Sequence, residues 1–186
     1  MAKQEDYRLR PLEEPDLEMV LRWRNLEHIR ANMYTDHIIT MEEHQAWFDR
    51  ISKDKKVCYL VSEFQNRSIG LVYFTNIDSL SNKCYWGFYL GEADVPLGSG
   101  SAMEFLALDY AFEILKIRKL CCEVLAFNNK VIKHHKKFCF QEEGTFVQQI
   151  FKNNRYEDIV CLALFRDKWS EEKTALQKLV FRTKKQ

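Results

Sequence analysis

Apolar and polar residues alternate in several short segments of the chain, a pattern that predicts β-strands with one buried face. The predicted strands occupy residues 7–12, 57–64, 68–77, 83–91 and 120–127, with two closing strands within residues 143–152 and 157–165. Turn-prone pairs separate neighbouring strands at Asn66-Arg67, Ser81-Asn82 and Asn153-Asn154. We therefore expect the strands between residues 57 and 91 to form an antiparallel meander.

Apolar residues recur at helical spacing in the segments between these strands. The first predicted helix covers residues 17–25 after Pro15-Asp16, with Leu17, Val20 and Leu21 on one face. The second contains His44 and begins at the capping box 40–43. The others are a mostly buried helix up to residue 116, a helix over residues 128–138, and an exposed helix over residues 170–186. The order β-α-α-β-β-β-α-β-α-β-β predicts an α+β fold, a mixed sheet with helices on both faces.

Length and composition agree with one folded domain, which we place at residues 1–168, followed by a basic helical tail at residues 169–186. Of the 186 residues, 46% are hydrophobic and 30% are charged, which excludes a disordered protein. The net charge of +1 gives no global basic field for nucleic acid. No segment approaches the ~18 apolar residues of a membrane span, so we expect a soluble, cytoplasmic protein that binds neither nucleic acid nor membrane.

The six cysteines do not have the spacing of a metal or redox site. None of them forms a CxxC pair, and most lie inside apolar, strand-like segments. We therefore expect reduced, buried thiols and no bound metal.

A glycine turn at residues 95–101 separates a strand from the long helix that follows. Gly98 and Gly100 let the backbone approach a ligand closely, and the first helical turn offers unpaired N–H groups to a pyrophosphate. An ordinary tight turn explains the same residues. The segment lacks the dinucleotide fingerprint because position 103 is Met, and it lacks the Gly-Lys-Ser/Thr of a P-loop.

A second segment, residues 123–140, joins a strand to a helix through Asn128 and Asn129. One helix face is apolar and includes His135, while Lys130, Lys133 and Lys137 lie on the opposite face. Those lysines suit phosphate groups, and they equally suit a solvated helix face.

In this order and spacing, the two segments resemble the GNAT N-acetyltransferase superfamily. The glycine turn is similar to its acetyl-CoA loop, and the second segment is similar to its pattern E-V-x-x-x-N-x-x-A-I-x-L-Y-x-K-x-G-F. The matching residues are Glu123, Val124, Asn128, Ile132, Lys137 and Phe140. The chain departs from the pattern at Val95, where a basic residue or Gln is usual, at His135, which replaces Tyr, and at Cys139, which replaces Gly.

The resemblance implies a GNAT fold of about seven mostly antiparallel strands and acetyl-CoA as co-substrate. The cofactor residues it implies are Phe88, Leu90, Leu97, Gly98, Ser99, Gly100, Ser101, Ala102, Asn128, Lys130, Val131 and Lys137. It also implies that a backbone N–H near Tyr89 polarises the thioester and that the amine attacks directly.

Two side chains are the candidates for proton transfer. Glu123 is the candidate base, acting through a water, or else a strand carboxylate paired with a lysine. His135 is the candidate acid in place of tyrosine, or only a hydrogen-bond partner of the thiol.

Short motifs in the first half of the chain are similar to the PseH family, whose members acetylate the 4-amino group of a UDP-linked dideoxy sugar in pseudaminic acid synthesis and flagellin glycosylation. The motifs are Trp23-Arg24-Asn25, Met33-Tyr34, Glu43-His44 and Thr75-Asn76. The resemblance implies a UDP-amino sugar as partner, allows a homodimer, and gives these substrate residues: Arg24, Met33, Tyr34, His44, Thr75 and Tyr89. Arg24 suits a diphosphate because its guanidinium can bind two oxygens, although a surface arginine has the same sequence pattern.

Three other functions remain open. A RimJ/RimL-type protein or polyamine acetyltransferase shares the overall pattern, but a polyamine favours an acidic surface, whereas Arg24, Arg30 and His44 favour an anion. A non-catalytic acyl-CoA-binding module would explain the loss of the tyrosine. An interaction protein would use the basic tail, which carries Lys178, Arg182, Lys184 and Lys185.

Overall fold

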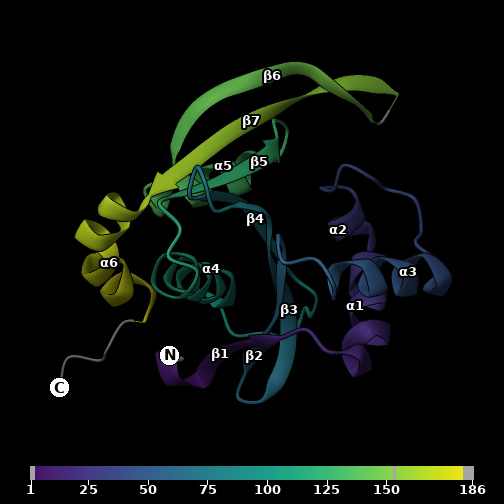
Figure 1. The fold of residues 1–186 in the computed structure, drawn as a ribbon, viewed down its shortest axis with the longest axis horizontal. Coiled ribbons are helices and arrows are strands. Elements are labelled where there is room, and N and C mark those ends of the chain that lie inside the picture. Colours follow the sequence, from purple (N-terminus) through teal and green to yellow (C-terminus); the bar gives the residue numbers. More distant parts are fainter. Residues whose placement is uncertain (1–2, 153, 182–186) are drawn as a thin grey trace.

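The computed structural model describes residues 3–152 and 154–181, and its centre is a single seven-stranded sheet with helices on both faces (Figure 1). The strands are β1 (Tyr7–Pro11), β2 (Cys58–Phe64), β3 (Arg67–Asp78), β4 (Lys83–Leu90), β5 (Lys119–Leu125), β6 (Gln141–Lys152) and β7 (Arg155–Phe165). The predicted α+β fold and the antiparallel meander of β2, β3 and β4 are confirmed.

The strand order is β1-β2-β3-β4-β5-β7-β6, and β4 and β5 form the parallel pair among antiparallel neighbours. Their ladder is short: it runs from the pair Lys83–Lys119 to the pair Tyr85–Cys121. Beyond it, β4 continues to Leu90 paired with β3, and β5 continues to Leu125 paired with β7, but the two strands no longer pair with each other. The sheet therefore opens in its middle, and backbone groups along both strands are left for another partner.

The helices follow the predicted order, with one short addition. They are α1 (Leu17–Arg24), α2 (Glu27–Arg30), α3 (Met41–Ile51), α4 (Ser99–Asp109), α5 (Asn129–Lys137) and α6 (Arg166–Val180), with single turns η1 (Gln4–Asp6), η2 (Glu14–Asp16) and η3 (Tyr110–Ile114). The predicted capping box is confirmed, because Thr40 accepts from the Glu43 N–H at 3.2 Å and Glu43 accepts from the Thr40 N–H at 2.7 Å. Sequence patterning did not predict α2, which has four residues.

The two faces of the sheet bury separate cores. One core includes Trp86 of β4 together with residues of α4, α5 and α6. The other core lies under α1 and α2 and includes Trp23 and Tyr89. On α1 the buried residues are Leu17, Val20 and Trp23, whereas Leu21, expected on that face, is half-buried. Because side chains alternate along a strand, β4 contributes even-numbered residues to the first core and Tyr89 to the second.

Helix α6 corrects the prediction of an exposed C-terminal helix. It begins at Arg166 and buries Trp169 completely, with ring centroids 5.1 Å from Phe105 and 6.1 Å from Phe112. Leu176 belongs to the same core. The helix thus packs on α4, and the boundary predicted after residue 168 falls inside it. Of the predicted tail and turn residues, Asn153, Arg182, Lys184 and Lys185 lie outside the described residues.

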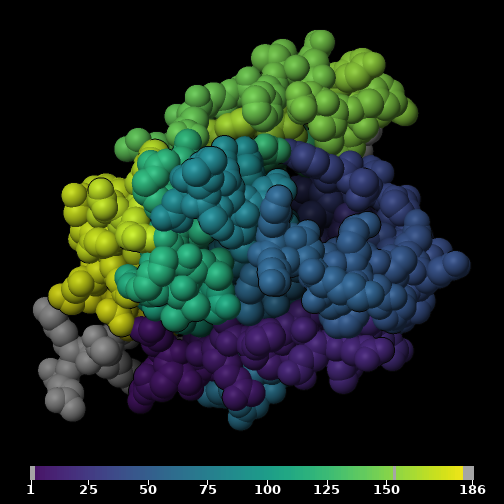
Figure 2. All heavy atoms as spheres, in the orientation of Figure 1, coloured from purple at the N-terminus to yellow at the C-terminus, as the bar shows by residue number. Residues whose placement is uncertain are grey.

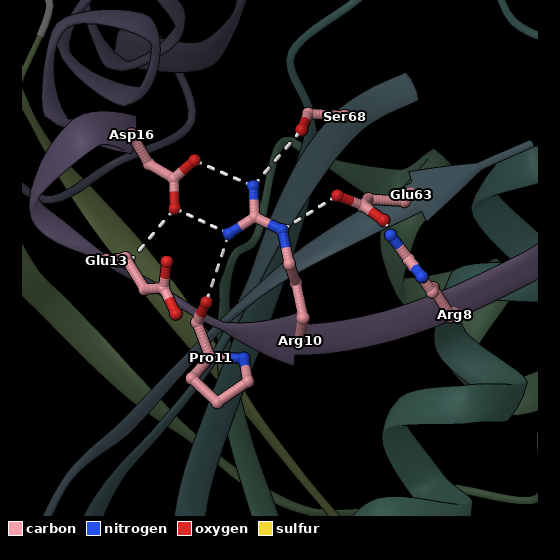
Figure 3. A network of polar contacts seen from close by, with 7 residues as sticks. All are labelled: Arg8, Arg10, Pro11, Glu13, Asp16, Glu63 and Ser68. Carbon is pink, nitrogen blue, oxygen red and sulfur yellow. Dashed lines mark hydrogen bonds and ion pairs between the residues drawn. The ribbon is translucent and has the colours of Figure 1, made fainter. Parts of the chain in front are cut away.

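An ionic network fastens the start of α1 to the edge of the sheet (Figure 3). Arg10 of β1 bonds both oxygens of Asp16, at 2.6 and 2.7 Å, and Oε1 of Glu63, at 2.7 Å. Arg8 pairs with the other oxygen of Glu63. The two carboxylates are nearly buried, so each requires this compensation.

Three smaller expectations concern turns, thiols and membrane helices. Left-handed backbone at Gln65 and Asn66 shifts the predicted Asn66-Arg67 turn by one residue, and Asn82 and Asn154 also have positive φ. All six cysteines are free, although Cys58, Cys139 and Cys161 are half-buried rather than buried. Within residues 3–152 and 154–181, no helix combines the length and apolar character needed to cross a bilayer.

Candidate active site

The opening between β4 and β5 contains a cavity of about 500 Å³. We call it the cofactor cavity. Phe88, Tyr89 and Leu90 line it from β4, and Glu123 lines it from β5. Asn128, Val131 and His135 line it from the turn before α5 and from α5 itself. Residues predicted from separate motifs are therefore brought together where the sheet opens.

The backbone N–H groups of β4 point alternately toward β3 and toward the opening on the β5 side. The Gly91 N–H donates to the Ile69 carbonyl at 2.9 Å, and the register continues with Leu71 opposite Tyr89. Because hydrogen-bonding residues alternate along an antiparallel strand, the Tyr89 N–H faces β3. The N–H groups of Phe88 and Leu90 face the side from which β5 has diverged. They are better placed than the predicted Tyr89 amide to meet a ligand in the cavity.

The predicted glycine turn forms the start of α4. Gly98 has φ of +95°, a left-handed conformation that glycine adopts readily, and an added Cβ would meet nothing within 4 Å. The side chain of Ser99 is held inward by Pro96 and Tyr7. No hydrogen bond involves the N–H groups of Gly100 and Ser101 in the part of the chain that the structure describes, and the turn carries no acidic residue. The turn thus offers free donors at the positive end of a helix.

The remaining predicted cofactor residues lie at the margin of the cavity or outside its lining. Leu97 is fully exposed, and Lys130 and Lys137 are exposed on α5. Across the described ranges, neither lysine forms an ion pair with an acidic side chain. Both are free to meet an anion at the surface, and Leu97 does not line the cavity.

A second cavity of about 370 Å³ lies on the face of the sheet covered by the first three helices. We call it the acceptor pocket. Its wall is largely aromatic, with Trp47 on α3 and Tyr59 and Tyr73 on neighbouring strands. Met33, Tyr73 and Tyr89 line both cavities, so the two meet at these side chains. Gly87 permits this wall, because a Cβ there would lie 2.3 Å from the Tyr73 hydroxyl.

Arg24 reaches the acceptor pocket from the end of α1. One guanidinium nitrogen donates to the carbonyl and hydroxyl oxygens of Thr35, at 2.9 and 3.1 Å, and the other terminal nitrogen is buried without a partner. No carboxylate of the described chain forms an ion pair with it. Burial lowers the pKa of Arg24. A half-buried cation that lines a cavity and has an unused donor is suited to an anion.

His44 is buried in the same wall and stacks on Trp47 with a centroid distance of 4.8 Å. Its Nε2 has no hydrogen-bond partner, and burial lowers the pKa of the imidazole, so the ring is neutral at pH 7. Like Arg24, it lines the pocket and has a polar atom without a hydrogen-bond partner. Thr75, predicted beside it, lies on β3 opposite Tyr85 and lines neither cavity.

Glu123 and Tyr34 form a direct contact. The Tyr34 hydroxyl donates a hydrogen bond to Glu123 Oε2, and burial, followed by this carboxylate, raises the pKa of the phenol. Glu123 makes no ion pair with a lysine among the described residues, so the predicted alternative of a carboxylate–lysine pair is not what the structure contains. The candidate base instead has a phenol partner that comes from the loop before α3.

Lys152 anchors that loop. Its side chain is 2% exposed, and its Nζ lies 2.9 Å from Asp36 Oδ2, 3.0 Å from the Met33 carbonyl and 3.4 Å from the Arg30 carbonyl. The β6–β7 hairpin therefore holds the segment that carries Met33 and Tyr34. In Figure 2 the green hairpin lies over the blue segment, and the surface between them is hollowed.

Sequence reasoning missed four contributors: Trp47, Tyr59, Tyr73 and Lys152. Each lies in an ordinary helix or strand pattern. Only the tertiary arrangement brings the three aromatic residues to the acceptor pocket and Lys152 to the loop before α3. Among the described residues, no cluster of His, Cys, Asp and Glu side chains has the arrangement of a metal site.

Comparison with known proteins gives the family and the fold. The family described as acetyltransferase (GNAT) domain matches residues 9–161. Spermidine N(1)-acetyltransferase of Escherichia coli (strain K12) is 25% identical over 181 residues, 97% of each chain. Acetyltransferase PseH of Campylobacter jejuni is 31% identical over 124 residues, 66% of this chain and 74% of that protein.

Among solved structures, the spermidine N-acetyltransferase of Vibrio cholerae in complex with CoA and spermine superimposes with a TM-score of 0.84. It is 24% identical and covers 89% of this chain and 99% of its own. At that identity the likeness concerns the fold, which agrees with the seven-stranded sheet described above.

Proposed function

The chain belongs to the GNAT acetyltransferase family, and on that premise we propose that it moves acetyl from acetyl-CoA to the 4-amino group of a UDP-linked amino-dideoxy sugar. The coarser activity, acetyl-CoA-dependent N-acetyl transfer, follows from the family and from relatives that are N-acetyltransferases. The acceptor is the proposed part. What supports it is the chemistry of the acceptor pocket.

Acetyl-CoA would lie in the opening between β4 and β5. The amides of Phe88 and Leu90 would bond pantetheine or the thioester carbonyl, and Asn128 and Val131 would contact pantetheine from the opposite side. The first turn of α4 would hold the pyrophosphate through the free amides of Gly100 and Ser101, since the predicted amides of Ser99 and Ala102 already donate to the carbonyls of Pro96 and Gly98. Lys130 and Lys137 would supply positive charge at the surface.

The amine would attack the thioester directly from the acceptor pocket. Glu123 would take its proton through a water, which requires the Tyr34 hydroxyl to share or release the carboxylate. A β4 amide would stabilise the oxyanion. His135, whose ring lines the cofactor cavity, would then protonate the departing thiolate.

Arg24 is the observation that carries the acceptor proposal. Arg24 lines the pocket and has a guanidinium nitrogen without a hydrogen-bond partner, a donor that a diphosphate oxygen would satisfy. A polyamine would instead bring ammonium groups toward an existing cation, with like-charge repulsion and no new hydrogen bond. The aromatic wall formed by Trp47, Tyr59 and Tyr73 suits the packing of a nucleotide or sugar ring.

Spermidine is the second candidate. The spermidine acetyltransferases align over more of the chain than PseH does, and Glu92 and Glu123 line the cofactor cavity. In the acceptor pocket itself, the carboxylate is Glu43, which accepts from the Thr40 N–H and lies 3.3 Å from His37. That carboxylate is already engaged, which favours the anionic acceptor.

The test is thiol release from acetyl-CoA with three amines in parallel: a UDP-4-amino-4,6-dideoxy sugar, spermidine and short peptides with free N-termini. We expect turnover with the UDP-sugar at least about tenfold above the other amines at equal concentration, the effect of one charge-assisted hydrogen bond. Turnover confined to spermidine or to a peptide would discard the acceptor proposal while leaving the family activity intact.

A further inference from the structure

A buried carboxylate lies beside the cofactor cavity without a role in the chemistry described so far. Glu104 is on α4, one turn beyond the glycine turn, and its side chain is 0% exposed within the larger core. A carboxylate removed from water requires a cation or hydrogen-bond donors beside it. The partners of Glu104 are therefore informative.

Both oxygens of Glu104 meet imidazoles from α5. Oε1 is hydrogen-bonded to His135 Nδ1 at 2.8 Å, and Oε2 lies 2.8 Å from His134 Nε2. The His135 side chain is 4% exposed and the His134 side chain 27%. Another titratable group within the influence of Glu104 is the Cys122 thiol of β5, whose pKa is raised by burial and by Glu104. Within the described ranges, no lysine or arginine pairs with Glu104.

This cluster fixes the orientation of His135. Because Nδ1–H donates to Glu104, the nitrogen left for the cavity is Nε2. Aromatic rings of Trp86, Phe88 and Phe140 surround the imidazole at centroid distances of 5.2 to 6.1 Å, which further restricts its rotation. The ring is thus held in one tautomer with one nitrogen toward the ligand.

The cluster also keeps a negative charge beside the ring. Burial alone would raise the pKa of the Glu104 carboxyl, but the two imidazoles outweigh it and hold that pKa below its usual range. In general, an opposite charge at hydrogen-bonding distance favours the charged form of a titratable group. This matters because an isolated histidine, with a pKa of about 6.5, is mostly deprotonated above pH 7.

We propose that Glu104 is a positioning residue that keeps His135 protonated and aimed at the thioester sulfur, with His134 as the solvent-facing member of the cluster. When the amine forms its bond to the acetyl carbon, the C–S bond breaks and its electron pair stays on sulfur. The sulfur takes the Nε2 proton of His135, which becomes neutral while Nδ1–H remains on Glu104. The amine proton leaves through Glu123 to solvent, and the cluster regains a proton from solvent beside His134.

The proposal rests on the proposed role of His135 and does not depend on which amine is the acceptor. It also accounts for the departure from the family pattern, in which a tyrosine stands at this position. A phenol is neutral at pH 7 and needs no counter-ion. A histidine that must deliver a proton above its ordinary pKa does need one, and Glu104 supplies it.

The test compares Glu104→Gln with the wild type in two measurements. Gln keeps an oxygen for Nδ1–H and removes the charge. We expect the NMR titration of His135 to move down by about one unit, because one opposite charge has been removed. With the UDP-amino sugar, and separately with spermidine, we expect kcat at pH 8 to fall about tenfold while the acetyl-CoA KM changes less than about threefold.

Two further variants separate the possible explanations. His134→Gln removes a competitor for Glu104, so we expect the His135 titration to move upward, opposite to Glu104→Gln. Glu113→Gln removes an exposed carboxylate from η3 and should shift neither measurement. If Glu104→Gln does not fold, the upward shift in His134→Gln still tests the proposal.

The failures of the two roles are distinguishable. If the His135 titration is the same in wild type, Glu104→Gln and His134→Gln, the positioning role of Glu104 is wrong even where His135→Phe is slow. If His135→Phe turns over at the wild-type rate with either amine, the role of His135 is wrong, and the proposal for Glu104 falls with it.

Discussion

The hydroxyl of Tyr34 donates to the carboxylate of Glu123, which lines the cofactor cavity, although Tyr34 itself lines neither cavity. Tyr34 comes from the loop before α3, and Glu123 lies on β5 in the middle of the sheet. Their hydrogen bond links the loop before α3 to the proposed base. If Glu123 acts as the base, a bound amine and its water have to take over part of that contact.

Replacement of Glu123 by Gln should therefore affect catalysis more than binding. We expect kcat to fall by about a hundredfold or more, since general base catalysis contributes 10²–10⁴-fold, with the acetyl-CoA KM nearly unchanged. Steady-state thiol release at saturating acetyl-CoA measures both constants. Tyr34→Phe keeps the ring and should cost less. A Glu123→Gln enzyme with wild-type kcat would show that Glu123 is not the base.

At the residue scale, site residues that belong to a continuous sequence motif could be predicted. Residues whose partners lie far away in the sequence could not. The spacing from Glu123 to His135 predicted that a strand end and a helix face would meet, and both line the cofactor cavity. Glu104 was not predicted, because a lone carboxylate in an apolar helix has no local signal for its partners 30 residues later. A short motif predicted Thr75 in the site, but this residue lies on β3 opposite Tyr85 and lines neither cavity.

The start of α4 is the element that the cofactor assignment depends on most. Gly98→Ala forces a side chain into left-handed backbone, which costs about 1–2 kcal/mol although there is space for the Cβ. If the turn holds the pyrophosphate, the acetyl-CoA KM should rise several-fold with kcat little changed. Parallel thermal unfolding measures the loss of stability. A lowered Tm with an unchanged acetyl-CoA KM would remove the turn from the binding site.

We predict that the β6–β7 hairpin affects the binding of the acceptor but not the binding of acetyl-CoA. Lys152→Met removes the ammonium that binds two backbone carbonyls and Asp36, so residues 30–36 should lose their fixed position. We expect the KM for the acceptor to rise about tenfold, because the hydrogen bonds of one charged group have been lost. The KM for acetyl-CoA should stay within about twofold. Lys168→Met, which breaks an exposed ion pair on α6, is the matched control. Equal changes in both KM values would contradict a role confined to the acceptor loop.

At the element scale, strand and helix order was predictable because each segment carries its own periodicity. The capping box at Thr40 located the start of α3 from four residues. The packing of α6 on the core could not be predicted in this way. The helix is mostly polar, and its sequence alone does not show that Trp169 packs against Phe105 and Phe112. Short α2 was missed because four residues hold too little periodicity to recognise.

Stability of the whole molecule should depend on acid through the network around Arg10. The hydrogen bonds from Arg10 lower the pKa of Asp16 below its ordinary 3.8. For Glu63, burial raises the pKa, but bonds from Arg10 and Arg8 outweigh it and leave the pKa below 4.5. Carboxylates with lowered folded pKa values stabilise the fold above their unfolded values, and this contribution is lost as pH falls below about 4.5.

The variant Arg10→Met tests that contribution. At pH 7 we expect a loss of about 1.5–3 kcal/mol in the free energy of unfolding, the range for hydrogen bonds to charged groups. The gap between the variant and the wild type should narrow as the pH falls below about 4.5, because the unfolded chain then takes up protons that the folded wild type, with its lowered carboxyl pKa values, still resists. Urea unfolding at pH 7 and at pH 3.5 measures the difference. An equal gap at both values would mean that the network contributes no acid-dependent stability.

The sheet opening explains how the two halves of the molecule cooperate. The face with α4 and α5 carries the cofactor assignments, the face with α1, α2 and α3 carries the acceptor pocket, and Met33, Tyr73 and Tyr89 lie where the cavities meet. Sequence order predicted the sheet and its helices. It could not predict that the parallel ladder stops at Tyr85 and Cys121, because the residues of each strand alone contain no signal for where the pairing with the other ends.

The central claim is that the acceptor pocket selects an anionic amine through Arg24. The direct measurement is the ratio of kcat/KM for a UDP-4-amino-4,6-dideoxy sugar to that for spermidine, in wild type and in Arg24→Met. Arg118→Met, an exposed arginine that lines neither cavity, is the control. We predict a ratio well above one that falls about tenfold to a hundredfold in Arg24→Met and is unchanged in the control. A wild-type ratio below one, or a ratio that Arg24→Met leaves unchanged, would contradict the account.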